Sequence, residues 1–310
     1  MAAMDDATRY RLLDCGRGRR LEAFGRLVVD RPAPMADGNR RGSGQWADAI
    51  TYRAGRGWAD AGGARPDETS WPVELAGMTL EAQLGPGGQV GIFPEHAGYA
   101  AWVRDAVTAR VGGAPPPEAA AVDTATPGSA PEVLNLFAHS GLICLVAAGA
   151  GARVTHVDAS RPAVQAARRN ADGSGLDSHP IRWIVDDAMA FVRREVRRGR
   201  RYDGFVIDPP TYGHGARDTD DRGWLLDRDL GPLLEACRGL ANDDAFWVLS
   251  AHTPEWDGRR LTMALEDAAV AGPLAGPRTM PRRLEIEAES GALLTLGWVA
   301  LLDPLRPDPR

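Results

Sequence analysis

A regular alternation of short apolar runs and amphipathic segments fills the chain after residue 131 and constrains its fold more than any other feature. Five apolar runs are expected to be strands, and a segment with helical periodicity follows each of them. These runs are residues 132–137, 153–158, 181–187, 202–210 and 244–252. Repeated strand–helix units give parallel strands joined by right-handed crossovers, with helices on both faces. The sequence therefore predicts an α/β fold with a doubly wound, mostly parallel sheet, completed by two final strands at 282–289 and 292–302.

The part before this alternation has a different pattern. Residues 8–90 contain short runs broken by turn residues every 8–12 positions, which is typical of a small β-rich domain. Trp46, Trp58 and Trp71 are its expected core, because large aromatic side chains dominate small cores. A helix that Pro94 opens is expected over 94–110. We predict an N-terminal domain at 1–111, a linker rich in proline, alanine and glycine at 112–130, and the α/β domain at 131–310.

Composition excludes several classes of chemistry. The 310 residues are 44% hydrophobic and 25% charged, as in a soluble globular protein. All 36 basic residues are arginine, which excludes lysine Schiff-base chemistry, P-loop ATP binding and pyridoxal-phosphate catalysis. The net charge of −6 argues against a general nucleic-acid coating protein. Residues 1–65 nevertheless carry 12 arginines against eight acidic residues, which suits either a polyanion site or a solvated surface.

Neither a membrane segment nor a metal site is expected. No stretch approaches the roughly 18–20 uncharged apolar residues of a membrane helix. The N-terminus carries two early acidic residues and lacks the apolar region of a secretory signal, so we expect a cytoplasmic protein. Cys15, Cys144 and Cys237 lie far apart in the sequence, which predicts buried free thiols rather than disulfides or a zinc site.

Ligands of such sheets bind outside the carboxyl ends of the strands, so the residues there are the candidate site. Residues 135–141 stand at the end of the first strand and contain a single glycine, Gly141, with no G-x-G-x-x-G motif. This disfavours a dinucleotide and leaves open a nucleoside without phosphates. Asp158 ends the second strand, where a carboxylate either accepts hydrogen bonds from ribose hydroxyls or caps the next helix.

The third and fourth strands also end in acidic residues. Of Asp186 and Asp187, one is placed to accept the exocyclic amine of an adenine and the other to cap a helix. The sharpest local signal is the run from Asp208 to Tyr212, Asp-Pro-Pro-Thr-Tyr. Its two prolines stiffen the turn and remove two N–H donors, beside a carboxylate and an aromatic ring. The alternative is an ordinary proline-rich turn that leaves a strand.

In chain order, NLFAHSG, THVDAS, WIVDDA and VIDPPTYG resemble the motifs of class I S-adenosylmethionine-dependent methyltransferases. More closely, they resemble the ribosomal-RNA methyltransferase family that includes the bacterial enzymes making 5-methylcytosine and 7-methylguanine in 23S (large-subunit) RNA. LLDCGRGRRLEAFG, VDRPAP and GIFPEHAGYAAW resemble the domain that precedes the catalytic one in that family. The resemblance covers most of the chain.

The resemblance implies the seven-stranded, Rossmann-like methyltransferase sheet and S-adenosyl-L-methionine as cofactor. It implies that the residues at the strand ends bind the cofactor, with Asp158 at the ribose and Asp187 and Ala188 at the adenine. The implied cofactor-binding residues are Phe93, Glu95, Asn135, Phe137, Ala138, Gly141, Asp158, Ala159, Asp187, Ala188 and Asp208. The implied catalytic residues are Asp208, Pro209, Pro210 and Tyr212.

The sequence departs from the 5-methylcytosine enzymes of that family, which use a nucleophilic cysteine near the catalytic strands. Neither the run 208–212 nor Ser250–Thr253 contains a cysteine, so transfer to a base nitrogen is favoured. That nitrogen is either an N7-type lone pair, which needs only positioning, or an exocyclic amine of an extruded base. The expected partner is RNA, most specifically ribosomal RNA. A small-molecule methyltransferase and a non-catalytic S-adenosylmethionine-binding protein are the alternatives, and the oligomeric state is not specified.

Two further segments lie near these motifs. The arginine run over 193–201 ends the helix that leads into the fourth strand, so we expect a solvated surface at the amino edge of the sheet. Residues 213–215, Gly-His-Gly, follow the 208–212 turn and are expected to form a loop that closes over the substrate. His139, His214 and His252 lie near strand ends, but no histidine–aspartate pair is evident from the sequence.

Overall fold

The fold was analysed in a computed structural model that describes residues 8–42, 46–67, 69–111, 130–213, 223–269 and 279–305. The chain forms two compact units. The smaller unit comprises Met1–Gly98 and Leu284–Leu296, and the larger unit comprises Tyr99–Arg283 and Gly297–Arg310.

A seven-stranded sheet forms the centre of the larger unit, in the order β10-β9-β8-β11-β14-β16-β15. Its strands are β8 (Glu132–Leu136), β9 (Arg153–Asp158), β10 (Ile181–Val185), β11 (Tyr202–Ile207), β14 (Ala241–Ala251), β15 (Met280–Glu287) and β16 (Leu293–Leu302). The first five strands of that order pair in parallel, whereas β16 pairs antiparallel with β14. The predicted doubly wound, mostly parallel sheet is confirmed.

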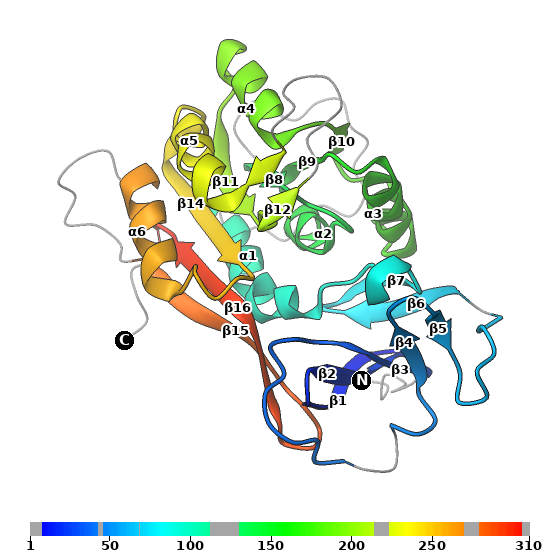
Figure 1. Ribbon diagram of the computed structural model, residues 1–310. Helices are drawn as coiled ribbons and strands as arrows, with labels where there is room; N and C mark the ends of the chain where they lie inside the picture. The colour runs from blue at the N-terminus through cyan, green and yellow to red at the C-terminus, as the bar shows by residue number, and fades with distance from the viewer. Residues whose placement is uncertain are drawn as a thin grey trace. The chain divides into compact units, whose positions relative to one another are not determined.

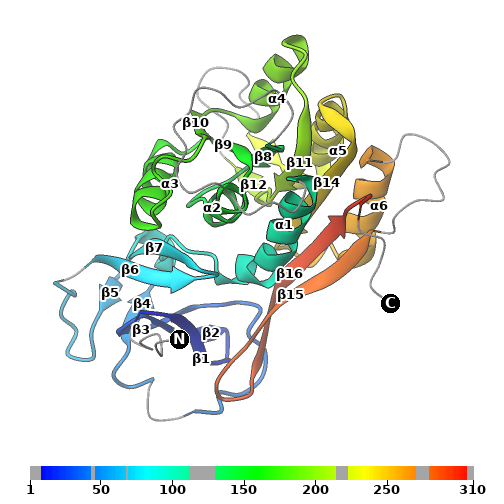
Figure 2. The ribbon, with the colours of Figure 1, turned by 180° about the vertical axis from the view of Figure 1, so that it is seen from behind.

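Helices cover both faces of this sheet (Figures 1 and 2). They are α1 (Ala97–Arg110), α2 (Leu142–Gly149), α3 (Arg161–Gly173), α4 (Ala188–Arg197), α5 (Leu226–Arg238) and α6 (Gly258–Ala269). Adjacent residues of β14 pack on opposite faces of the sheet, because side chains alternate along a strand. Phe246 contacts Trp102 of α1 edge-on, whereas Trp247 stacks on Phe205 in the core cluster that α4, α5 and α6 share.

The packing of Phe246 also explains a glycine in the neighbouring strand. A Cβ atom at Gly204 of β11 would lie 2.2 Å from the Phe246 ring. Only a residue without a side chain leaves room for the ring at this position, so close packing requires Gly204. The Arg110 guanidinium lies over the same Phe246 ring. Arg110 also forms an ion pair with Asp303, at 2.9 Å.

The smaller unit is β-rich, as predicted. Its five-stranded sheet has the order β1-β2-β3-β4-β5, and β6 and β7 form a separate hairpin. The strands are β1 (Tyr10–Gly16), β2 (Arg19–Phe24), β3 (Leu27–Pro32), β4 (Ile50–Arg53), β5 (Gly57–Ala59), β6 (Ser70–Leu75) and β7 (Met78–Gln83). Two short 3₁₀ turns follow, at Pro86–Gly88 and Pro94–His96. Trp58 and Trp71 are buried, but Trp46 is only partly buried.

The observed units differ in two places from the sequence-based division at 111 and 131. Helix α1 goes with the larger unit, because its Trp102 packs on Phe246 and its Arg110 pairs with Asp303. The tip of the β15–β16 hairpin goes with the smaller unit, where Leu294 joins a core cluster with Leu12 of β1. Residues 112–129 of the predicted linker lie outside the described residues.

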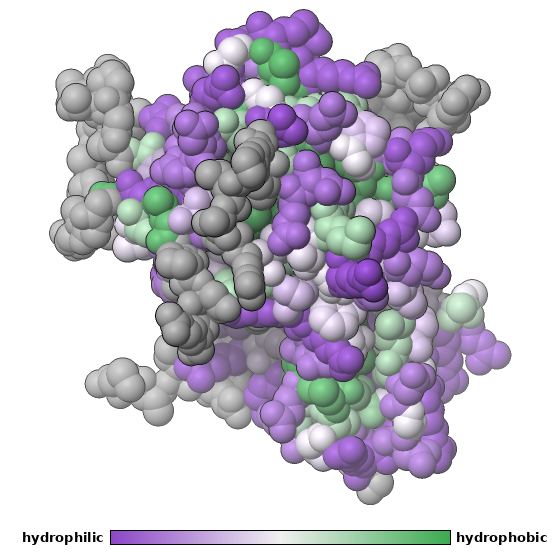
Figure 3. All heavy atoms as spheres, turned by 90° about the vertical axis from the view of Figure 1, so that its left-hand side faces the viewer, coloured by the Kyte–Doolittle hydropathy of each residue, from purple (hydrophilic) through white to green (hydrophobic). Residues whose placement is uncertain are grey.

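The face of the molecule that Figure 3 shows is mainly polar where its residues are described. Hydrophilic residues dominate the face in Figure 3, and its apolar residues are scattered in small groups. None of the helices in the described part of the chain is long and apolar enough to cross a membrane.

Candidate active site

Strand register brings the predicted residues to one edge of the sheet. Leu136, the last residue of β8, lies opposite Val157 of β9 and Ile207 of β11. Ile207 in turn lies opposite Leu249 of β14, and Asp158 lies opposite Val185 of β10. The loops and acidic residues that follow these strands therefore share the carboxyl edge, where ligands of doubly wound sheets bind.

The loop after β8 has an unusual backbone. Phe137 and His139 have φ values of 56° and 43°, and Gly141 has a φ of 82°. Non-glycine residues seldom adopt this left-handed region, and such strain clusters at functional sites. The Ala138 N–H donates to Val157 O at 3.1 Å, and the Gly141 N–H donates to Ala138 O at 2.9 Å. The first bond ties the loop to the end of β9, and the second closes a turn within the loop.

Gly141 is the N-cap of α2, and no side chain caps this helix. A Cβ atom at Gly141 would lie 3.0 Å from the Ala167 side chain of α3. The glycine therefore satisfies both a positive φ and a close approach of two helices. It leaves the uncapped amide end of α2 beside the loop.

Asp158 joins two of the loops at this edge. Its Oδ2 accepts the His139 N–H at 2.9 Å, and its Oδ1 accepts the Ser160 N–H at 2.8 Å. Ser160, not Asp158, caps α3, through a bond from the Ala163 N–H. An ionised carboxylate has about four acceptor positions, so two remain for hydroxyl groups. Ala159, next in the chain, is exposed.

The acidic pair after β10 has mainly local partners. Asp187 is the N-cap of α4 and accepts the Ala190 N–H at 2.9 Å. Asp186 accepts the Asp187 N–H at 2.9 Å and also pairs with Arg194. Ala188 is buried in the core cluster. The structure thus places a helix cap at Asp187, and an adenine contact at Asp187 and Ala188 stays a prediction.

Hydrogen bonds from residues at the start of α5 and just before it hold the corner after β11 in place. Pro209 is buried and Pro210 is exposed. Trp224 Nε1 donates to Pro210 O at 2.7 Å, and the Leu226 N–H donates to Thr211 O at 3.1 Å. The two-residue strands β12 (Tyr212–Gly213) and β13 (Trp224–Leu225) pair antiparallel across this corner. Tyr212 is 75% exposed, so its ring is open to a ligand.

Trp224 links this corner to the first loop. Its ring centroid lies 4.8 Å from that of Phe137. The loop after β8 and the corner after β11 are therefore joined by an aromatic contact as well as by neighbouring strands. Residues 214 and 215 of the predicted closing loop lie outside the described residues.

Asp208 has two partners on β14 or just beyond it. Ser250 Oγ donates to Asp208 Oδ1, and His252 Nε2 lies 2.9 Å from the same oxygen. An ionised carboxylate only accepts hydrogen bonds, so this contact is a hydrogen bond in the tautomer that has a proton on His252 Nε2. Both side chains stay partly accessible, Asp208 at 16% and His252 at 29%. The sequence analysis missed this pair; the alternation of Ser250 and His252 at the strand end was the available signal.

Asn135, predicted at the cofactor, has a partner inside the larger unit. Its Nδ2 donates to Cys144 Sγ at 3.2 Å, and Cys144 lies 3.3 Å from His156 Nδ1. Burial raises the pKa of Cys144 to about 12 and lowers that of His156 to about 3, so both groups are neutral. The three cysteines are free and buried, as predicted. A cofactor contact at Asn135 stays a prediction.

Phe93 and Glu95 belong to the smaller unit. Phe93 precedes the 3₁₀ turn Pro94–His96 and stacks on His96 with ring centroids 5.5 Å apart. Glu95 is buried. The cofactor contact that the resemblance implies for Phe93 and Glu95 stays a prediction.

The fold is shared with known proteins. A crystal structure described as the SAM-dependent methyltransferase from Agrobacterium tumefaciens is 29% identical, with a TM-score of 0.81 over 96% of this chain and 91% of that one. The chain has the class I S-adenosylmethionine-dependent methyltransferase fold. Trm5 of Methanocaldococcus jannaschii, solved with adenosine, shares this methyltransferase fold at 11% identity, with a TM-score of 0.51 over 90% of this chain and 70% of that one.

Sequence comparisons match only part of the chain. The family model described as conserved hypothetical protein 95 matches residues 121–219. Ribosomal RNA large subunit methyltransferase K/L of Methylococcus capsulatus is 32% identical over 140 residues, which are 45% of this chain and 18% of that protein. Ribosomal RNA large subunit methyltransferase I of Aeromonas salmonicida is 33% identical over 135 residues, 40% of this chain and 34% of that protein. The chain thus spans about a third of the length of one of these relatives and less than a fifth of the other.

The residues at this edge suit S-adenosylmethionine. The cofactor has a ribose diol, an adenine and a positively charged sulfonium centre. Asp158 offers free acceptor positions for the diol, and Asp208 adds a partly exposed carboxylate beside the Phe137–Trp224 ring pair. Carboxylates and aromatic faces both stabilise a cation. In contrast, a pyrophosphate would meet acidic groups and one glycine, which agrees with the expectation against a dinucleotide.

Proposed function

We propose that the chain transfers a methyl group from S-adenosyl-L-methionine to a base nitrogen in RNA, and specifically in ribosomal RNA of the cytoplasm. The single observation that carries this proposal is the alignment of Asp158 and Asp208 at one sheet edge, with the proline corner beside Asp208. The similarity to the large subunit methyltransferases K/L and I supports RNA as the acceptor.

The cofactor, when bound, supplies a methyl group activated by its sulfonium charge. On this proposal, Asp158 accepts hydrogen bonds from the ribose hydroxyls with the oxygen positions that the loop amides leave open. The loop from Phe137 to Gly141 closes over the same part of the cofactor. Its hydrogen bonds to β9 fix its shape before the cofactor arrives, which lowers the entropic cost of binding.

The β11 corner orients the acceptor. Tyr212 is exposed and offers its ring face to an extruded base. The Pro209 carbonyl and the Asp208 carboxylate are hydrogen-bond acceptors for an exocyclic amine. Ser250 donates to Asp208 Oδ1 and His252 Nε2 lies 2.9 Å from the same oxygen, and these two contacts fix the carboxylate at the corner. An N7-type acceptor would use the same positioning without loss of a proton.

The test is the partition of label from S-adenosylmethionine with a tritiated methyl group. The chain is incubated with ribosomal RNA transcribed in vitro, which carries no modification, and separately with a small-molecule extract. We expect label in RNA with the wild type and with Asp267→Ala, an exposed control on α6, and none with Asp208→Ala. Label confined to the small-molecule fraction would establish the alternative acceptor class, and binding of the donor without transfer to either fraction would establish a non-catalytic protein.

A further inference from the structure

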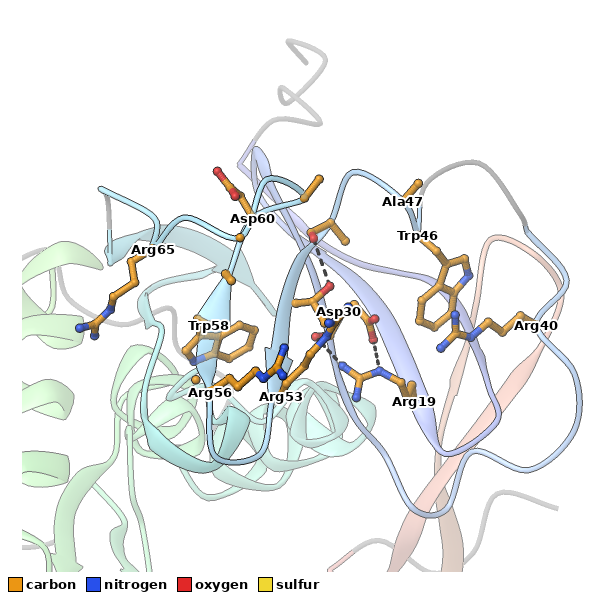
Figure 4. A pocket seen from close by; sticks show the side chains of 16 residues that line it. Arg19, Asp30, Arg40, Trp46, Ala47, Arg53, Arg56, Trp58, Asp60 and Arg65 are labelled. Carbon is orange, nitrogen blue, oxygen red and sulfur yellow. Dashed lines mark hydrogen bonds and ion pairs between the residues drawn. The ribbon is translucent and has the colours of Figure 1, made fainter.

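A hollow of about 620 Å³ opens on the five-stranded sheet of the smaller unit. Its walls come from β4, β5 and the segments around them, and Figure 4 shows the side chains that line it. Five arginines and two aspartates contribute to the lining, together with Trp46 and Trp58. Such a mixture of cations and aromatic rings is typical of a site for an anion that carries a flat group.

The charge of this hollow is positive after internal pairing is counted. Arg19 bonds to Asp30 Oδ1 at 2.5 Å and to Tyr52 O at 2.9 Å, so this cation and this acid neutralise each other. Asp60 accepts the Ala64 N–H at 2.8 Å. In contrast, Arg53 and Arg56 are exposed and have no ion pair with any described residue.

Arg53 and Arg56 lie at the turn between β4 and β5. The Arg56 N–H donates to Arg53 O at 3.0 Å, which closes the turn and fixes both residues at one rim of the hollow. Two unpaired guanidinium groups at a tight turn repel each other, a cost that a bound polyanion would remove. This arrangement favours a ligand with more than one negative charge.

The opposite part of the lining is a flat stack. The Arg40 guanidinium lies 3.8 Å from the centre of the Trp46 ring, and Trp46 Nε1 donates to Asp14 Oδ2 at 2.9 Å. The indole is therefore fixed, and the guanidinium plane above it forms a platform of the kind on which bases stack. Arg40 Nε is buried and has no hydrogen-bond partner among the described residues.

We propose that this hollow binds single-stranded RNA, with phosphates at Arg53 and Arg56 and one base stacked on the Arg40–Trp46 pair. The inference rests on the proposed function, since it assigns a second contact to the substrate RNA outside its target nucleotide. A free phosphate ion would not need the stacked pair. An acidic peptide would need the cations but not the flat platform.

The experiment measures binding of a fluorescein-labelled single-stranded 12-residue RNA to the full chain by fluorescence anisotropy at several salt concentrations. Arg53→Gln/Arg56→Gln is compared with Arg193→Gln/Arg197→Gln, which removes the same charge from exposed arginines of α4. We expect the first variant to bind at least about tenfold more weakly, and its salt slope to fall by about 1.4, because each phosphate contact to a single strand contributes about 0.7. The control should bind as the wild type does.

Trp46→Ala tests the stacked base separately. We expect it to weaken binding of the RNA but not of the same oligonucleotide with abasic positions. Equal losses in the two arginine variants, or inorganic pyrophosphate that competes as well as RNA does at equal charge, would overturn the proposal. Circular dichroism of each variant excludes loss of folding as the cause of weaker binding.

The two proposals fail separately. The anisotropy measurement of RNA binding needs no methyl transfer. RNA binding that Arg53→Gln/Arg56→Gln weakens, together with no label in RNA, would therefore overturn only the proposed function. Label in RNA together with unchanged affinity of Arg53→Gln/Arg56→Gln overturns only the RNA site in the hollow.

Discussion

Asp208 and His252 meet across two neighbouring strands, with His252 Nε2 2.9 Å from Asp208 Oδ1. Ser250 donates to the same oxygen. The pair lies at the carboxyl edge of the sheet, where β11 gives way to the Pro209–Pro210 corner. A carboxylate that two neighbouring side chains hold in one orientation meets the requirement for positioning an acceptor amine.

The first prediction separates these roles by kinetics. Asp208→Ala removes the acceptor and should abolish methyl transfer. His252→Ala and Ser250→Ala leave the carboxylate in place but less fixed, and should lower kcat by about tenfold with little change in KM for RNA. Steady-state transfer of tritiated methyl groups measures both constants.

The control for these variants is binding of S-adenosylhomocysteine by calorimetry. We expect the affinities of His252→Ala and Ser250→Ala to stay within about threefold of the wild type, because no step of cofactor binding is assigned to His252 or Ser250. A His252→Ala enzyme with unchanged kcat would show that the pair has no role in transfer.

Asp158 gives a second prediction, on binding alone. Asp158→Ala removes the free acceptor positions and the anchor of the His139 amide, and should weaken S-adenosylhomocysteine binding by about 1–3 kcal/mol. Asp158→Asn retains one acceptor oxygen, so its affinity for S-adenosylhomocysteine should fall less than that of Asp158→Ala. Calorimetry measures both affinities, and equal affinity in all three proteins would remove the ribose assignment.

The buried ion pair of the larger unit gives a third prediction. The Arg110 and Asp303 side chains are 4% and 1% exposed, so removal of one partner leaves the other charge buried and unpaired. Arg110→Ala should lower the free energy of unfolding by about 3–5 kcal/mol. Urea unfolding measures this change.

The double variant Arg110→Met/Asp303→Leu is the matched comparison for that measurement. It removes both charges and keeps the space filled, so it should be more stable than Arg110→Ala. A double variant less stable than the single one would show that the pair itself contributes the stability.

His156 gives a fourth prediction, on pH. Burial in the larger unit lowers its pKa to about 3, against an ordinary value of 6.5. Between these values the unfolded chain binds a proton that the folded chain does not, so stability is lost as pH falls from 6.5 toward 3. The loss should reach about 2 kcal/mol at pH 5, since one pKa unit corresponds to about 1.4 kcal/mol.

The measurement is urea unfolding of the wild type and of His156→Asn at pH 7 and pH 5. The variant has no group that titrates at this position, so its stability should depend less on pH, whatever its absolute value. The same dependence on pH in both proteins would contradict the assignment of a neutral, buried imidazole.

The local sequence pattern was enough to predict the sheet. The apolar runs and the helical segments between them follow from side-chain periodicity, and the acidic residues after each strand follow from parallel topology. Asp158 and Asp208 were therefore placed at one edge correctly. The same reasoning located Trp58 and Trp71 in the core of the smaller unit.

Long-range contacts were beyond that pattern. The pair between Asp208 and His252 depends on the register of β11 and β14, which two distant segments set together. Helix α1 belongs to the larger unit because its Trp102 packs against Phe246 of β14, a residue distant in the sequence. From the sequence, Asp187 suited either an adenine contact or a helix cap. The hydrogen bond from the Ala190 N–H, which makes it a helix cap, is visible only in the structure.

The most direct test of methyl transfer to a base nitrogen is mass spectrometry of nucleosides. Unmodified ribosomal RNA is incubated with the chain and S-adenosylmethionine that carries a deuterated methyl group, and the RNA is then digested. The account predicts one deuterated nucleoside with the methyl group on a base nitrogen, absent with Asp208→Ala. A deuterated methyl group on carbon, as in 5-methylcytosine, or no labelled nucleoside at all, would contradict it.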